Sequence, residues 1–285
     1  MGDHTARDVY AVSKALATAV LNDAAGSFSS LTTEQKITAL YLAKAYKTYE
    51  ALYLLVAQGY EEDALALSRT IFEIAIHVMF LVEGECLSSQ PDEVDKRIEQ
   101  MRNHSIVAQV RHYKEVKELQ ADWTYPDRYD FSSYIRHIEG VFYFHDALAA
   151  YDSFEKKLKR DWWGDISFKQ LVYRLSYRPR EYLKHPGAYL GKRLAFLYHK
   201  MYSSQSLQIH SSSLSFDNYL KRGVDGSLGL HWKRDSSKAS AYEVMRDATT
   251  MLYVTVYYLV GVRKQADAEW YQPLIQKFMS VMNAG

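Results

Sequence analysis

Apolar residues recur every three to four positions along most of the chain, a spacing typical of amphipathic α-helices. The second such segment opens with Thr32 and Gln35, the residue types of a capping box, and Pro91 marks the start of the fourth. We therefore predict an all-α fold, a multi-helix bundle with long antiparallel helices. The predicted helices cover residues 6–22, 32–58, 61–82, 92–119, 133–160 with a break near Gly140, 167–177, 186–210, 242–266 and 270–282.

Residues 211–240 interrupt this pattern. They contain several glycines and serines and the dipeptide Asp225-Gly226, which favours a tight turn. We expect a long loop or a small hairpin here. Elsewhere the chain shows no internal repeat and no linker composition, so we expect residues 1–285 to form a single all-helical domain.

The predicted helix over Leu65–Val82 is apolar nearly all round but carries Arg69, Glu73 and His77 at successive spacings of four. A helix this apolar belongs in a core, where a charge is costly unless it is paired. Two interpretations stay open. The pair Arg69 and Glu73 is a structural ion pair, or it is a guanidinium held by a carboxylate and directed at an anion. For His77 we expect a satisfied core histidine.

The amino-acid composition supports the helical prediction, and the missing residue types and motifs exclude several kinds of functional site. Only 5 Pro and 13 Gly occur, whereas 24 Tyr suit core edges, interfaces and stacking surfaces. The single cysteine, Cys86, excludes a disulfide framework and a thiolate metal cluster. Phosphate-binding-loop, dinucleotide, nucleophile-elbow, zinc-protease and Glu-x-x-His motifs are also missing from the sequence, so we expect no metal and no cofactor.

The sequence also bears on location. Its first residues lack the basic and apolar regions of a secretory signal. Of the two most apolar stretches, 65–82 is charged and 251–262 is too short to span a bilayer. We expect a soluble, cytoplasmic protein with no membrane association.

A second group of candidate residues lies near the end of the predicted helix over 186–210. Ser203, Ser206 and His210 are spaced so that they share one helix face. A histidine near solvent can act as a general acid or base at neutral pH. The alternative is a cluster that caps the helix end.

A third group lies in a basic part of the chain. Lysine and arginine outnumber acidic residues between Lys156 and Arg193, although the net charge of the whole chain is only +1. Interleaved tyrosine and arginine can stack on bases while neutralising phosphates, and the alternative is a solvated face. The candidate nucleic-acid-binding residues are Arg174, Tyr177, Arg178 and Arg180.

The strings GYEEDALALSRTIFEIAIHVMFLVE and KRLAFLYHKMYSSQSLQIHSSS resemble a bacterial family known only as a domain of unknown function. The resemblance implies an all-helical bundle, with the family's paired charges at Arg69 and Glu73 and its Ser and His at Ser206 and His210. The chain is also distantly similar to the HEPN superfamily, small helical bundles that include many metal-independent ribonucleases of defence and toxin systems. Their signature separates an arginine from a histidine by four to six residues, as in Arg97/His104, Arg180/His185 and Arg193/His199.

These observations favour a HEPN-like metal-independent ribonuclease, or another nucleic-acid-directed effector, acting in bacterial stress or phage defence. Arg69 would hold the phosphate, Glu73 would orient Arg69, and His210, with Ser206 on the same face, would move protons. This hypothesis requires the helices over 65–82 and 193–210 to be antiparallel neighbours. The alternatives are a non-catalytic binding or regulatory module and a receptor for a small anionic ligand. The partners expected are RNA, a second copy of the chain in a homodimer, or another protein.

Overall fold

A computed structural model describes most of the chain. The described residues are 5–83, 91–122, 131–140, 144–145, 148–149, 151, 166–176, 191–203, 220–222, 227–230, 238–265 and 268–283. They form two compact units, one from Met1–Ser89 with Val172–Gly285 and the other from Gln90–Leu171. Helices make up nearly all of the described structure, which confirms the predicted all-α fold. A single domain over residues 1–285 stays a prediction.

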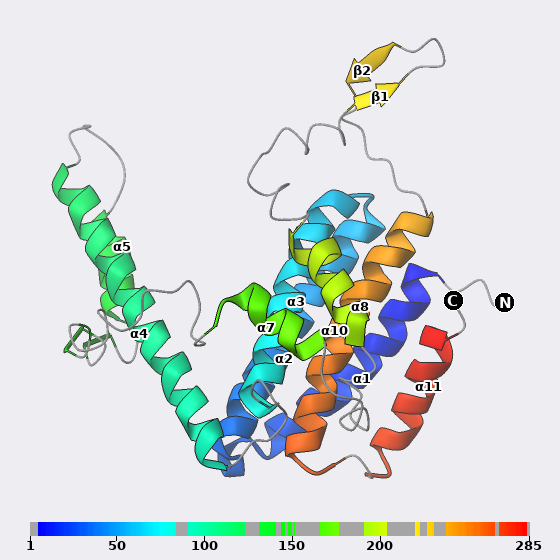
Figure 1. Cartoon of the computed structure of the whole chain (residues 1–285), viewed down its shortest axis with the longest axis horizontal. Coiled ribbons are helices and arrows are strands. Elements are labelled where there is room, and N and C mark those ends of the chain that lie inside the picture. The colour runs from blue at the N-terminus through cyan, green and yellow to red at the C-terminus, as the bar shows by residue number, and fades with distance from the viewer. Residues whose placement is uncertain are drawn as a thin grey trace. The chain divides into compact units, whose positions relative to one another are not determined.

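The first unit is a bundle of long helices (Figure 1). α2, α3 and α10 all contact one another, and α1 packs against α2, α10 and α11. A shorter helix, α8, runs directly into a π-helix that packs against α3. The bounds are α1 Ala6–Gly26, α2 Thr33–Ala57, α3 Glu61–Glu83, α8 Gly191–Leu197, the π-helix Tyr198–Ser203, α10 Lys238–Val262 and α11 Tyr271–Asn283, with a 3₁₀ turn at Phe28–Ser30.

Local signals set several helix ends. The Thr32 hydroxyl accepts from the Gln35 backbone N–H, and the Gln35 side-chain oxygen accepts from the Thr32 N–H, so the predicted capping box is confirmed. At the other end of α2, Gly59 takes the left-handed conformation with φ 79°, which glycine adopts without a steric penalty. The helix therefore starts and stops where its sequence predicts.

α3 is the central helix of this unit. Ile71, Phe72, Ala75 and Ile76 are completely buried, as expected for so apolar a segment. By length and composition α3 could cross a membrane, but 56% of its most apolar window is buried inside the protein. Because α2 and α10 pack on it extensively, α3 is a core helix of the bundle.

A polar contact crosses this core. Tyr49 of α2 is completely buried, and its hydroxyl bonds to the hydroxyl of Thr249 in α10. The Ser13 hydroxyl of α1 in turn donates to Thr249. Burial raises the pKa of the Tyr49 phenol, so the group stays neutral. The contact fixes the register of three helices against one another.

The second unit consists mainly of α4 (Pro91–Asp122), as long and charged as its sequence predicts, and α5 (Phe131–Glu139). The two helices pack through Val116, Ile135 and Ile138. On their surface His112 Nε2 lies 2.9 Å from the hydroxyl of Tyr134. α5 ends just before Gly140, where the helical pattern predicts a break.

Two further segments bear on the predictions. Strands β1 (Leu220–Arg222) and β2 (Leu228–Leu230) pair antiparallel, so the hairpin alternative for 211–240 is confirmed, while Asp225-Gly226 lies outside the described residues. The predicted helix over 186–210 is confirmed for residues 191–203, the part that the structure describes, and α8 changes to a π-helix at Tyr198. The wider turn of a π-helix changes which side chains share a face, and such turns are frequent at functional sites.

Candidate anion-binding site

The pair Arg69 and Glu73 lies one turn apart on α3. Arg69 Nε donates to Glu73 Oε1 over 3.1 Å, and the two side chains keep 20% and 34% of their exposure. The helix is a core helix, as predicted, but these charges lie at its solvent edge instead of inside the core. The pair is therefore accessible in part to a ligand.

A pair of stacked tyrosines of the π-helix lies beside the guanidinium. Arg69 Cζ lies 4.3 Å from the centroid of the Tyr202 ring, within the range of a cation–π contact. The Tyr198 and Tyr202 rings stack with centroids 5.2 Å apart, and both contact Phe72 of α3 at 6.3 and 6.4 Å. The guanidinium is thus held by a carboxylate on its own helix and by an aromatic ring from another segment.

A tyrosine–histidine pair adjoins this cluster. The hydroxyl of Tyr173, in α7 (Phe168–Ser176), lies 2.7 Å from His199 Nε2. His199 is exposed, and its ring lies 5.4 Å from that of Tyr198. Contacts therefore run without interruption from Arg69 through Tyr202 and Tyr198 to His199 and Tyr173, a set we call the Arg69 site.

The pKa of the Tyr198 phenol reflects the groups that lie around it. Burial raises the pKa of the Tyr198 phenol, Tyr202 and Tyr173 act in the same direction, and the positive charge of Arg69 opposes them. Arg69 and Tyr173 therefore both lie close enough to Tyr198 to interact with its phenol. Three separate elements, α3, α7 and the π-helix, converge on one place.

Lys200 fastens the π-helix to α10. Its Nζ lies 2.6 Å from Asp247 Oδ2 and 3.2 Å from Glu243 Oε2. Burial lowers the pKa of Lys200, but the bonds and charges of Asp247 and Glu243 outweigh it and raise that pKa overall. Lys200 therefore stays cationic and holds the segment that carries Tyr198, His199 and Tyr202.

Comparison with known proteins places the chain in a family. Residues 35–227 match the model of a family of unknown function, DUF5677. The chain belongs to DUF5677. The matched region contains every residue of the Arg69 site, and membership agrees with the resemblance to an uncharacterised helical family. No curated protein and no solved structure matches the chain.

In this DUF5677 protein the predicted site residues have different outcomes. Arg69 and Glu73 come together, and Arg174 is exposed on α7 next to Tyr173. His77 is half-buried, with its ring 6.1 Å from that of Tyr41 in α2. The remaining candidates Ser206, His210, Tyr177, Arg178 and Arg180 lie outside the described residues.

The sequence pointed to no site role for Tyr198, and it did not place Tyr173 or Tyr202 beside Arg69. The high tyrosine content and the spacing of four between Tyr198 and Tyr202 were the available signals. Neither shows that these rings meet Arg69, since that contact joins segments far apart in the sequence. Within the described ranges, no group of three or more His, Cys, Asp and Glu is placed to hold a metal ion.

Proposed function

We propose that this DUF5677 protein binds RNA at the Arg69 site and cleaves it without a metal ion. The observation that carries the proposal is the Arg69 guanidinium, fixed by Glu73 and Tyr202 at the solvent edge beside the Tyr173–His199 pair. A guanidinium held in place suits bidentate contact to a phosphate. Tyrosine rings suit stacking on bases, and histidine changes protonation near neutral pH.

The reaction that these groups support is an internal transesterification. The RNA 2′-oxygen attacks the adjacent phosphorus, the bond from phosphorus to the 5′-oxygen breaks, and a 2′,3′-cyclic phosphate and a 5′-hydroxyl result. Arg69 would stabilise the charge that develops on the phosphoryl oxygens. One histidine takes the 2′-hydroxyl proton and a second gives a proton to the leaving 5′-oxygen. We assign these roles to His199 and His210.

Neighbouring residues would support these steps. Tyr173 would orient the His199 ring through its hydrogen bond, and Glu73 would hold Arg69. We propose that Ser206, four residues before His210 in the sequence, also contributes. The exposed Arg174, on the same helix as Tyr173, would contact RNA phosphates beyond the cleavage point, together with Tyr177, Arg178 and Arg180.

The test is incubation of the protein with total RNA in the presence of EDTA, followed by gel analysis. We expect cleavage by the wild type and its loss in Arg69→Met, His199→Gln and His210→Ala. His112→Gln is the matched control, because His112 is also exposed and also bonded to a tyrosine hydroxyl. A folded wild type that leaves RNA intact, or an Arg69→Met protein with full cleavage, would refute the proposal.

The tyrosine rings around Arg69 also favour a second candidate function, a receptor for a small anionic ligand. Such a ligand would sit on the guanidinium with its apolar part against Tyr198 and Tyr202. Saturable binding of a mononucleotide, lost in Arg69→Met, without cleavage of RNA would assign this function. For both candidate functions we also propose that the protein is cytoplasmic, forms a homodimer and binds a protein partner.

A further inference from the structure

Two half-buried side chains near the start of α10 each carry a buried polar atom without a hydrogen-bond partner. Arg246 Nε and the Tyr242 hydroxyl are both buried, and neither meets a partner among the residues that the structure describes. The two residues lie one turn apart, with Arg246 Cζ 5.9 Å from the centroid of the Tyr242 ring. Buried donors that lack acceptors are rare in native proteins, because each costs the free energy of its lost hydration.

The charge of Arg246 also lacks a balancing carboxylate. The nearest acidic residues along α10, Glu243 and Asp247, both pair with Lys200. In the described part of the chain, no carboxylate lies within ion-pair distance of Arg246. A partly buried cation whose Nε is shut off from water and lacks a counter-charge is less stable than a paired one, and a bound anion would supply the missing charge.

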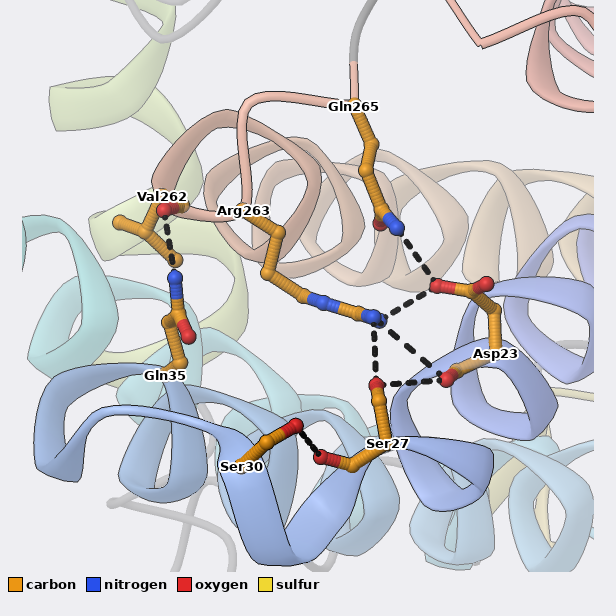
Figure 2. A network of polar contacts seen from close by, with 7 residues as sticks. All are labelled: Asp23, Ser27, Ser30, Gln35, Val262, Arg263 and Gln265. Atoms are coloured by element: carbon orange, nitrogen blue, oxygen red, sulfur yellow. Dashed lines mark hydrogen bonds and ion pairs between the residues drawn. The ribbon is translucent and has the colours of Figure 1, made fainter.

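Arg263 is a buried arginine with a structural role, and it serves as a comparison for Arg246. Its guanidinium lies 2.7 Å from an Asp23 carboxylate oxygen and donates to the Ser27 hydroxyl over 2.8 Å. Figure 2 shows this network, in which Gln265 also donates to Asp23. Arg263 ties the end of α10 to the end of α1, and every contact needed for that role comes from the protein. Arg246 has no such set.

We infer that Arg246 and Tyr242 form a second anion-binding site, separate from the Arg69 site, for a compact oxyanion such as a phosphate or carboxylate group. Arg246 Nε can only donate and the Tyr242 hydroxyl can donate its proton, so a ligand that satisfies both supplies acceptor oxygens. The guanidinium charge requires a negative ligand. Because the donors are enclosed and one turn apart on one helix, the bound group is small. This inference uses no residue of the Arg69 site and stands whether or not the protein cleaves RNA.

The test is thermal unfolding at constant ionic strength with increasing inorganic phosphate or acetate. We would use Arg69→Met protein as the background, so that the Arg69 site does not contribute. A ligand that binds only the folded state raises Tm with its concentration. We expect such a rise in the background protein and in a matched Arg7→Met control, which removes an exposed arginine that has no part in either site. Arg246→Met should abolish it.

Two further variants keep the test decisive. Tyr242→Phe removes one oxygen and should weaken binding about tenfold without unfolding the protein. Without ligand, Arg246→Met should melt at or above the Tm of its background, because the change removes an unbalanced charge. A rise with phosphate alone, or with acetate alone, identifies the bound group. No rise with either anion, or an equal rise in Arg246→Met, would overturn the inference.

Discussion

Arg69 and Tyr202 face each other across the contact between α3 and the π-helix, with the guanidinium carbon 4.3 Å from the ring centroid. Phe72, one turn further along α3, contacts Tyr198 as well as Tyr202. α3 and the π-helix are therefore neighbours, which the ribonuclease hypothesis requires, whereas their antiparallel direction stays a prediction. The ring fixes one face of the guanidinium while Glu73 fixes its Nε, so the charge is oriented before a ligand arrives.

The partial exposure of Arg69 and Glu73 predicts a modest effect on stability. Arg69→Ala should lower the free energy of unfolding by about 1–2 kcal/mol, below the roughly 3–5 kcal/mol that follows when a fully buried pair is broken. Urea denaturation measures this. Lys14→Ala is the matched control, because the Lys14–Glu50 pair has the same 3.1 Å separation but is more exposed, so its loss should change stability less. Equal losses in both variants would contradict this account.

Lys200 has two acidic partners that differ in burial, with 6% exposure for Asp247 and 57% for Glu243. Asp247→Asn should lower the free energy of unfolding by about 2–3 kcal/mol, because it leaves a half-buried ammonium without its closest carboxylate. Glu243→Gln should change it by less than about 0.5 kcal/mol. Urea denaturation of both proteins measures the difference. Similar losses would mean that the two carboxylates share the ammonium equally.

Tyr41 predicts a loss of stability in alkali. Burial raises the pKa of its phenol from 10.0 to about 12, so the folded state holds this proton more tightly than the unfolded state. The resulting stability is complete below pH 10 and is lost as the pH rises towards 12. Between pH 10 and pH 12 the free energy of unfolding of Tyr41→Phe should therefore fall by about 2 kcal/mol less than that of the wild type. Denaturation at several pH values tests it, with Tyr134→Phe, an exposed position, expected to follow the wild type.

Two helix ends offer a paired test of backbone conformation. α2 and α10 end in the same motif, with Gly59 at φ 79° in one and Lys264 at φ 54° in the other. At the end of α2, the Tyr60 N–H donates to Leu55 O and the Gly59 N–H donates to Val56 O. At the end of α10, the Gln265 N–H donates to Val260 O and the Lys264 N–H donates to Gly261 O in the same way.

Because a side chain is disfavoured at positive φ, Lys264→Gly should stabilise the protein by up to about 1 kcal/mol. Gly59→Ala should destabilise it by about 1 kcal/mol for the same reason. The midpoints of urea unfolding report both changes. Shifts in the same direction would show that side-chain contacts, and not φ, decide these positions.

The sequence by itself determined the features that depend on near neighbours. The capping box of Thr32 and Gln35, the stop at Gly59 and the break before Gly140 each involve residues within one turn. The apolar stretch of α3 also predicted a core helix, because burial of that much apolar surface leaves few alternatives. Spacing alone brought Arg69 and Glu73 together, since residues four apart on a helix are neighbours.

Only the tertiary structure decided what surrounds that pair. Of the three polar residues that share one stripe in the sequence, Arg69 contacts Tyr202 of the π-helix, whereas the His77 ring lies near Tyr41 of α2. Tyr202 reaches Arg69 because α8 gives way to a π-helix that Lys200 fastens to α10. These contacts depend on how segments far apart in the chain pack together, and residue spacing carries no information about that distance or orientation.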